Sequence, residues 1–512
     1  MRVYAVTGVP PEVQAYAMAR YSRSAQSMRE SVAELSAQRA EEFLNTFYFQ
    51  YGHRSIADLA HLAIAVEDIS ILAAIRVVDE PLWDGQERST RYQDFRRSGY
   101  VVPDAVAASS RAEDYRRAAD ALFTAYEDLS RQAFELLAAH YPRPADMEPA
   151  AYRRTLRARA FDLARYLLPL ATRTSVGQVT SARVLERQIA RLLADPLPEA
   201  RAVGEALHTA CREPAYDLTR ERLRAIAEAC PDARTRAALA AALAPEPLAP
   251  TLVKHIAPDR YAAETYHVMT QAAREVLGEL PPDTSRIVDL VDPAPPEEEL
   301  VATLLYRADP GGRSYRQVLK LVRELSPVRR RELLDLSFQG RGPHDEWLRE
   351  HRAGYAVTFD LLLDIGAFRD LHRHRRCVQV IPPITGLLGR DDAATVVRRG
   401  LGAAGDEAVR AGLADRLAAA LDAGVAAAAA LRAQFPVEAA YLLPLGARMR
   451  ALFKMDLAEA AYIIELRTGP TGHFSYRWLA WEMYQALRAR HPTLAAHIRA
   501  QDPAQPVDML RR

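Results

Sequence analysis

The sequence predicts a helix-rich α/β (α+β) protein with small sheets, built from two similar halves. Most of its 512 residues show the three-to-four spacing of apolar side chains that marks amphipathic helices, as in residues 15–47 and 111–140. Strand-like segments are few, and the clearest are residues 2–9, 286–291 and 378–381. Two stretches recur in the same order along the chain, which indicates repetition of a domain.

The first recurring stretch is a strand, a Pro-marked turn and an amphipathic helix, at residues 2–22 and 286–307. The second carries YLLPL near its start, at residues 164–193 and 439–467. Chance likeness between helical regions is the alternative, but YLLPL at the same relative place favours duplication. We therefore predict three segments, and these are residues 1–245, a linker or helical insert at 246–284, and residues 285–512.

Composition sets broad limits on function. Lys plus Arg is 67 and Asp plus Glu is 66, a net charge of +1 that argues against a surface built for nucleic acid or acidic lipid. Three cysteines, Cys211, Cys230 and Cys377, make neither a disulfide framework nor a CxxC metal knuckle, so a reducing cytoplasm is expected. No run approaches the ~20 apolar residues of a membrane span.

A polar segment, DGQERSTRYQDF at residues 84–95, follows an apolar helix. Its backbone N–H groups, with the side chains of Arg88, Ser89, Thr90 and Arg91, form a chemically suitable phosphate site. A solvated polar loop is the more common explanation of such a segment taken alone.

A basic triplet, Arg373, His374 and Arg375, follows an apolar helix in FRDLHRHRRC. In an extended backbone the two arginines share one side and the histidine takes the other, which suits a dianion or an electron-rich ring. A basic surface patch is the alternative. A zinc site using His351 and His372 with His374 lacks supporting Cys or carboxylate spacing, so no metal is predicted.

Two further arginines stand among apolar residues on predicted helices. Arg165 lies in the first YLLPL stretch, and Arg467 closes the second in ELRTGPTGH. A buried arginine needs a partner, which is either a structural carboxylate or an anionic ligand.

These motifs together resemble the flavin-dependent thymidylate synthases, present here as two diverged tandem copies. The family carries GHxSxxEH, RHRxxSxNExSxRY and a later ARxxLP…N-x-R…LR block. In the first half His53 and Ser55 match the start of GHxSxxEH, and the ExSxRY end is matched by residues 87–92. Arg165 and Arg183 match the later block, but Asp79, Glu80 and Pro81 stand in place of RHR, Ser181 in place of Asn and Leu192 in place of the final Arg.

The second half shows the opposite pattern. Its RHR is intact and Arg467 matches the final Arg, whereas VIPPITGLL replaces ExSxRY. Ala440 stands for the ARxxLP arginine and Asp456 for the Asn. In the family, these two sets of residues reach one site from neighbouring subunits. The resemblance therefore implies one complete composite site formed by the two halves.

The resemblance also implies a reaction, which is methylation of dUMP at C5 to dTMP. Methylenetetrahydrofolate is the carbon donor, and FAD reduced by NADPH supplies the hydride. Arg467 is expected to stabilise the N3-deprotonated uracil electrostatically, and Ser89 is the other candidate catalytic residue. Two chains are expected to pair, giving four family folds.

The remaining site residues implied by the resemblance fall into two groups. Nucleotide binding is assigned to Gln86, Glu87, Arg88, Ser89, Thr90, Arg91, Arg165, Asp370 and Arg373. FAD binding is assigned to His53, Ser55, Glu87, Arg183, Arg373, His374 and Arg375. The alternatives are a catalytically inactive flavin- or nucleotide-binding descendant, and an enzyme that methylates another pyrimidine nucleotide.

Overall fold

The structure is a computed structural model that describes residues 9–21, 56–245, 247–278, 280–340, 348–351, 354, 357–496 and 498–511. Two compact units divide the chain. Unit 1 comprises Met1–Val66, Leu82–Gln86 and Val176–Asp259, and unit 2 comprises Glu67–Pro81, Glu87–Ser175 and Arg260–Arg512. A three-stranded sheet has the order β1-β3-β2, with β1 at His61–Ser70, β2 at Asp84–Glu87 and β3 at Arg173–Ser181.

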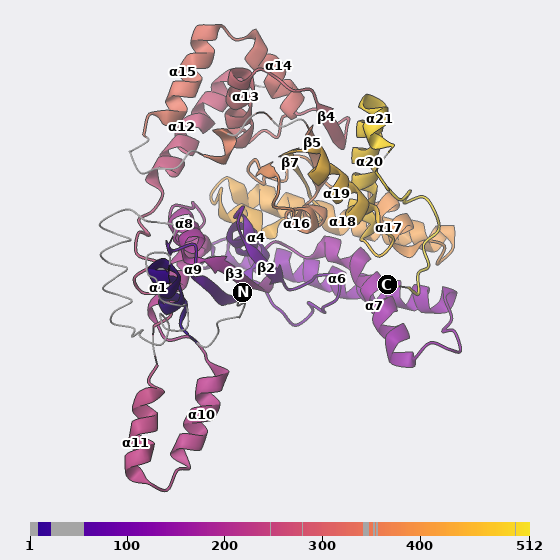
Figure 1. Ribbon diagram of the computed structural model, residues 1–512. Helices are drawn as coiled ribbons and strands as arrows, with labels where there is room; N and C mark the ends of the chain where they lie inside the picture. Colours follow the sequence, from indigo (N-terminus) through magenta and orange to yellow (C-terminus); the bar gives the residue numbers. More distant parts are fainter. Residues whose placement is uncertain are drawn as a thin grey trace. The chain divides into compact units, whose positions relative to one another are not determined.

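The described part of unit 1 contains the following helices. They are α1 (Pro11–Tyr21), α8 (Ala182–Leu193), α9 (Pro198–Arg212), α10 (Leu218–Glu228) and α11 (Ala233–Ala242). Helix α8 packs against α9, where the missing side chain of Gly204 lets the backbone approach Leu192, which is fully buried. Helices α10 and α11 form an antiparallel hairpin (Figure 1), in which Ala227 alone among the residues of these two helices is buried.

A four-stranded antiparallel sheet lies in unit 2, in the order β4-β5-β7-β6. The strands are β4 (Val288–Val291), β5 (Val357–Asp364), β6 (Val378–Val380) and β7 (Arg448–Met455). All eight residues of β5 are buried. Both faces of this strand are therefore covered, and its polar residues Thr358, Asp360 and Asp364 are buried together with the apolar ones.

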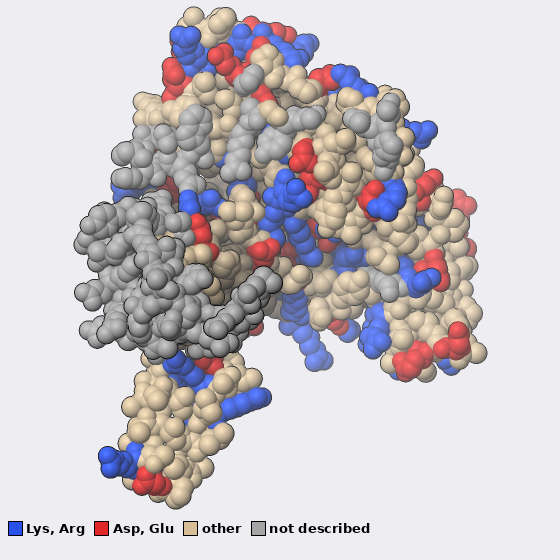
Figure 2. Space-filling model, viewed as in Figure 1, with Lys and Arg blue, Asp and Glu red and all other residues tan. Residues whose placement is uncertain are grey.

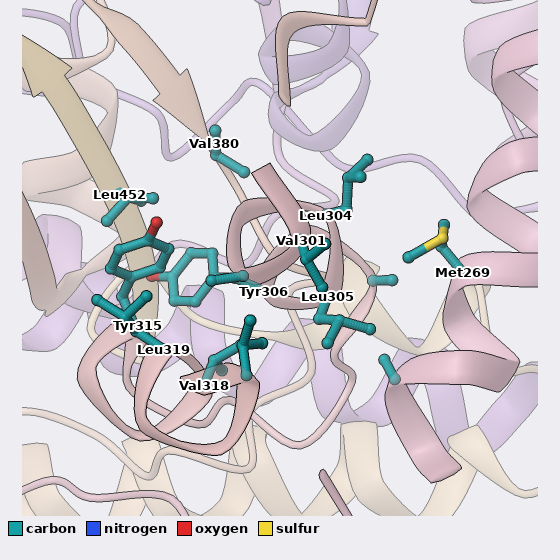
Figure 3. Packing of buried hydrophobic residues seen from close by; sticks show 14 of the residues in the cluster. Met269, Val301, Leu304, Leu305, Tyr306, Tyr315, Val318, Leu319, Val380 and Leu452 are labelled. Carbon is teal, nitrogen blue, oxygen red and sulfur yellow. The ribbon is translucent and has the colours of Figure 1, made fainter. Parts of the chain in front are cut away.

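Four helices and this sheet share one apolar core. The helices are α12 (Arg260–Leu277), α13 (Pro296–Ala308), α14 (Tyr315–Glu324) and α15 (Pro327–Phe338). Figure 3 shows Met269 of α12, Tyr306 of α13 and Leu452 of β7 within the same cluster. Helix α12 falls in the segment predicted as a linker or insert, and its apolar face is part of this core.

The rest of unit 2 is a layer of helices in which α6 runs beside α18 (Figure 1). The bounds are α4 (Ile71–Val78), α5 (Asp104–Ala107), α6 (Ala112–His140), α7 (Pro149–Ala164), η3 (Arg165–Leu167), η4 (Arg349–His351), α16 (Ile365–Leu371), α17 (Ala393–Leu401), α18 (Glu407–Arg432), η5 (Glu438–Leu442), α19 (Leu457–Thr468), α20 (Phe474–Arg490) and α21 (Pro492–Ala495).

The two YLLPL segments lie against each other with reciprocal hydrogen bonds. The amide of Leu170 donates to the carbonyl of Leu443 at 2.9 Å, and that of Leu445 donates to Leu168 at 2.9 Å. Pro169 and Pro444 stand opposite each other in an antiparallel bridge. The Leu-Pro-Leu sequence of one segment therefore meets its own counterpart about a local two-fold axis.

The same equivalence extends to the helices that precede each segment. Helix α4 begins after Ser70 and α16 begins after Asp364, and both side chains cap the new helix by accepting a backbone N–H three residues on. The first amide of α4 donates to Thr172 at 2.9 Å, and the first amide of α16 donates to Ala447 at 3.0 Å.

The sequence expectations fare differently. The helix-rich α/β class is confirmed, as are strands near 286–291 and 378–381 and a helix over 111–140. Residues 2–8 and 22–55 lie outside the described residues, so the first strand and most of the predicted 15–47 helix are untested. The two-domain division stays a prediction, and the compact units do not follow its boundaries. Among the described helices, none is both long and apolar enough to cross a bilayer.

Candidate functional site: an arginine cluster around Asp370

A buried ion pair stands at the centre of the candidate site in unit 2. Asp370, near the end of α16, accepts a hydrogen bond from Nη1 of Arg165 through Oδ2 at 3.0 Å. The side chains are 11% and 2% exposed, respectively. Burial by itself raises the pKa of Asp370, but the four arginines Arg165, Arg91, Arg373 and Arg467 together hold it well below the ordinary value.

Arg165 reaches this place because α7 ends at Ala164 and the chain tightens into η3. Its Nε and Nη2 atoms are buried and have no hydrogen-bond partner among the described residues. Nη2 lies over Gly366, where an added Cβ would come within 3.4 Å of it. Two donors of a buried guanidinium thus remain for a further acceptor, and an unmade charged hydrogen bond is costly.

Arg91 is satisfied by protein atoms. Its Nε donates to Asp162 at 2.9 Å, Nη1 to the hydroxyl of Tyr476 at 2.9 Å, and Nη2 to the carbonyl of Thr471 at 3.1 Å. Burial opposes its charge, but Asp162 and Tyr476 keep the pKa of Arg91 above the ordinary value. This arginine is a rigid cation close to Asp370.

Helix α19 holds the basic triplet through His374. Nε of Arg467 donates to Nε2 of His374 at 2.8 Å, and Nδ1 of the ring faces Glu459 at 3.7 Å. Burial, followed by the charges of Arg467, Arg375 and Arg373, lowers the pKa of His374 to about 3. The ring is therefore neutral and carries its proton on Nδ1, because Nε2 accepts from the guanidinium.

The two arginines of the triplet differ in exposure. Arg373 is exposed and makes no hydrogen bond or ion pair within the part of the chain described. Arg375 is half-buried and lines a cavity of about 140 Å³. Asp79 also lines this cavity and pairs with Arg349 at 2.5 Å. Asp79, which stands in place of RHR in residues 1–245, therefore lines the same cavity as Arg375 of the intact RHR triplet.

The charges around Asp370 do not cancel. Arg91, Arg165, Arg373 and Arg467 all act on Asp370, whereas Asp162 is the other carboxylate bonded to one of them. Asp364 also acts on Arg165, and burial raises the pKa of Asp364 to about 7, so the four cations face two ionised carboxylates and a third that is partly protonated near neutrality. The cluster therefore keeps an excess of positive charge, which suits a phosphate. On the face shown in Figure 2, blue and red side chains are interspersed.

Comparisons with known proteins identify the family of this chain. The family described as thymidylate synthase complementing protein matches residues 5–215 and 353–493. The chain belongs to this family. A UPF0159 protein of Chlamydia muridarum is 25% identical, covering 98% of this chain and 92% of that protein. One of Thermoplasma acidophilum is 25% identical, covering 95% and 94%.

Two solved structures are also similar in part. A UMP/dUMP methylase, PolB, from Streptomyces cacaoi has 18% identity and a TM-score of 0.28, covering 39% of this chain and 84% of that one. Thymidylate synthase X from Helicobacter pylori, solved with FAD and dUMP, has 16% identity and a TM-score of 0.23, covering 39% and 88%.

The family's motif residues are gathered unevenly. Unit 2 brings Arg91, Arg165, Asp370, Arg373 and Arg467 into one cluster. Glu87 joins its edge, accepting from Arg369 at 3.4 Å, and the hydroxyl of Ser89 accepts the amide of Arg91 at 3.2 Å. Thr90 is buried next to them in sequence.

Other predicted site residues lie elsewhere. The guanidinium of Arg88 stacks on Phe95 with its Cζ 4.4 Å from the ring centroid. Gln86 and Arg183 belong to unit 1, where Arg183 pairs with Asp58 at 2.9 Å. His53 and Ser55 lie outside the described residues. Among the described side chains, no group of three or more His, Cys, Asp or Glu is arranged to hold a metal.

The positions where the family has Asn serve a structural purpose here. Ser181 caps α8 by accepting the amide of Val184, and Asp456 caps α19 by accepting that of Glu459. Both residue types are strong N-caps, so the helix starts are preserved although the amide side chain is absent.

Three residues of the cluster were not found from the sequence. Asp162 precedes Arg165 by three positions at the end of α7, a spacing that places both on one helix face and was a usable signal. Glu459 and Tyr476 belong to α19 and α20, and no pattern marks either as a partner of a distant arginine.

Proposed function

We propose that this chain is an FAD-dependent thymidylate synthase that methylates dUMP at C5, with methylenetetrahydrofolate as carbon donor and NADPH as reductant. The observation that carries the proposal is the meeting of Arg91 and Arg165, from the first half, with Arg373 and Arg467, from the second, around Asp370. These arginines are among the residues that each half keeps of the family pattern. Membership of the family supplies the reaction class.

The proposed single composite site follows from the local two-fold axis. The position equivalent to Arg165 across the Leu-Pro-Leu pairing is Ala440, which has no charge to offer an anion. The reciprocal pairing supports an origin by tandem duplication. Under this proposal one of two related sites keeps its cations and the other has lost them.

We assign the nucleotide phosphate to the open donors of Arg165, with Arg91 as a fixed neighbouring charge. Ser89 and Thr90 are proposed to bind rather than attack, because the Ser89 hydroxyl is part of the turn that places Arg91. Arg467 is proposed to stabilise negative charge on the uracil ring, since its Nε is held by His374 and its two terminal nitrogens point to no partner in the described residues.

The residues present fit a flavin on one side of the cluster. Exposed Arg373 has open donors, and the neutral His374 ring is held at Nε2 by Arg467. Arg375 acts on this ring, and the buried Oε1 of Glu87, whose other oxygen accepts from Arg369, has no hydrogen-bond partner among the described residues. Bound FAD, once reduced, would supply the hydride that completes the methyl group.

A direct test uses the purified protein. Incubation with dUMP, methylenetetrahydrofolate, NADPH and FAD should yield dTMP, detected by chromatography, and the flavin absorbance should bleach on adding NADPH. Rescue of a thymidine-requiring strain by this gene alone should accompany it. A colourless protein that takes up no FAD and forms no dTMP would contradict the proposal.

One observation favours a second candidate, a non-catalytic nucleotide- or flavin-binding descendant. Arg91 is fully engaged by protein atoms, and Arg165 already has a carboxylate partner. Such a protein would bind dUMP without forming dTMP. A third outcome, methylation of UMP or another pyrimidine nucleotide in the same assay, would keep the mechanism and change the substrate.

Assembly is proposed as a pair of chains in the cytoplasm. Two chains would provide four family folds, and oligomers with closed two-fold symmetry are the commonest kind. Sedimentation at several concentrations should give twice the mass of one chain, 57.0 kDa. A strict monomer that still forms dTMP would show that one chain is sufficient.

A further inference from the structure

The ion pair between Arg165 and Asp370 is poorly matched for a permanent bond. A single contact joins Nη1 to Oδ2, although arginine and a carboxylate usually pair through two parallel hydrogen bonds when free to do so. Nε and Nη2 of Arg165 remain without partners in the described structure while fully enclosed. A ligand with three terminal oxygens is better suited to these donors than the carboxylate is.

We propose that Asp370 is a specificity-determining residue, an internal counter-anion that occupies Arg165 until a phosphate monoester replaces it and that disfavours ligands with further negative charge. The inference deepens the proposed function, since it takes a nucleoside monophosphate as the ligand of Arg165.

Charge balance explains the selectivity. With Asp370 ionised, the cluster still has an excess of positive charge, which suits one phosphate dianion. A diphosphate carries at least one more negative charge, which faces the Asp370 carboxylate in a buried setting where like charges repel strongly. Asp370 stays ionised at working pH because its arginine neighbours hold its pKa low.

Two other arginines are placed to pair with Asp370 when a phosphate binds Arg165. Arg373 is exposed with open donors, and Arg467 carries two terminal nitrogens without a partner in the described residues. Both already act on the Asp370 charge. When Asp370 changes its partner from Arg165 to Arg373 or Arg467, its carboxylate stays paired. Binding of the monoester therefore leaves no buried charge without a partner.

The test compares Asp370→Asn and Asp370→Glu with the wild type, by calorimetric titration with dUMP and with dUDP. Asp422→Asn is the matched control, because Asp422 pairs with Arg390 outside the cluster and its change alters net charge equally. Asp370→Asn should bind dUMP about tenfold more tightly, and the preference for dUMP over dUDP should fall about tenfold. Asp370→Glu and Asp422→Asn should retain the wild-type preference.

Each other outcome is decisive. Weaker binding of both nucleotides by Asp370→Asn would show that Asp370 holds the ligand, and the inference would be wrong. An equal change in Asp422→Asn would reduce the effect to net charge, with the same consequence. Inorganic phosphate and pyrophosphate serve as further probes. If these two show the expected pattern while dUMP does not bind, the proposed function fails and the charge selectivity stands. If none of the four binds, both fail.

Discussion

The two Leu-Pro-Leu segments have the same backbone and different side chains. Leu168–Leu170 and Leu443–Leu445 exchange reciprocal hydrogen bonds, and the last leucine of each accepts the second amide of an equivalent helix, α4 or α16. The residue three positions before the first segment is the buried Arg165, whereas the residue three positions before the second segment is Ala440. The paired backbone of the two segments is therefore the same whether or not an arginine stands beside it.

The difference separates packing from chemistry. Backbone groups buried where the two segments meet must be paired, so this paired backbone tolerates little change. A buried arginine is costly without an anion, so nothing preserves it where no anion binds. Under the proposed function, Arg165 marks the side that binds the nucleotide. The largest effects of mutation should then be structural on one side and catalytic on the other.

The largest expected loss of stability is at Leu192, the position where the family's final arginine is missing. Leu192 is fully buried between α8 and α9. Leu192→Ala should lower the free energy of unfolding by about 2–5 kcal/mol through the cavity that it leaves. Turnover per folded molecule should be unchanged, as measured by activity corrected for the folded fraction. A proportionate loss of turnover would mean that this half also has a working site.

Arg467 is the counterpart of Leu192 in the second half, and there the effect should be catalytic. Arg467→Ala should lower turnover roughly 100- to 1000-fold, because a charge contact made as negative charge develops is worth about 2.7–4 kcal/mol. FAD should remain bound, and Arg467→Lys should restore only part of the rate because it offers a point charge instead of a planar fork.

Arg499→Ala is the control for Arg467→Ala. Arg499 is an exposed arginine that pairs with Glu465 of α19, the helix that also carries Arg467. It should leave turnover within twofold. Parallel loss of flavin and turnover in Arg467→Ala would assign Arg467 to cofactor binding instead of to the substrate.

The packing where the two Leu-Pro-Leu segments meet is tested at Gly446, which follows the second segment as Ala171 follows the first. A Cβ at Gly446 would lie 2.7 Å from the Tyr166 ring and 2.9 Å from Leu421. Gly446→Ala should therefore destabilise by about 1–3 kcal/mol through overpacking. Ala171→Gly should cost only about 0.5–1 kcal/mol of backbone entropy. Denaturant unfolding with unchanged slope measures both. Equal effects would show that the two sides are packed alike.

The sequence indicated some elements of the fold and missed two central strands. YLLPL and the basic triplet pointed to elements that unit 2 brings together. By contrast, β7 reads RMRALFKM, residues that favour helices in isolation, and it is a strand because β5 and β6 pair with it on either side. Strand β5 reads VTFDLLLD, in which the alternation of apolar and polar residues ends at three consecutive leucines, and a pattern this short does not separate a strand from a buried helix.

The sequence named the arginines of the site and Asp370, but not the protein groups that hold them. Motif spacing identified Arg91 and Arg165, but not that Asp162, Tyr476 and Thr471 would satisfy Arg91 completely. Those partners come from α7, α20 and the turn before α20, and long-range side-chain contacts leave no periodic trace in a sequence. The capping roles of Ser181 and Asp456 were hidden for a similar reason, because they became clear only once the helix starts were known.

The smallest expected effect concerns the two equivalent caps, Ser70 and Asp364, which differ in having a charge. Asp364 is buried and accepts a hydrogen bond from the Ser475 hydroxyl. Burial, and then the charge of Asp391, raises the pKa of Asp364, although Arg165 opposes the shift. Asp391 is itself buried and is paired with Arg448 at 2.9 Å.

A carboxyl whose pKa is raised on folding binds more protons in the folded than in the unfolded state. Its contribution to stability is therefore fully present below the ordinary pKa of about 4 and is lost as pH rises towards the folded value. Wild-type stability should fall over this range with a slope of at most about 1.4 kcal/mol per pH unit from this group.

Asp364→Asn retains the cap and removes the charge, so its stability should depend less on pH and should exceed the wild type near neutrality. Ser70→Asn, the matched change at the neutral cap, should leave the pH profile unchanged. Unfolding curves collected from pH 4 to 8 for the three proteins measure this, and a wild-type profile that Asp364→Asn leaves unaltered would place the titrating group elsewhere.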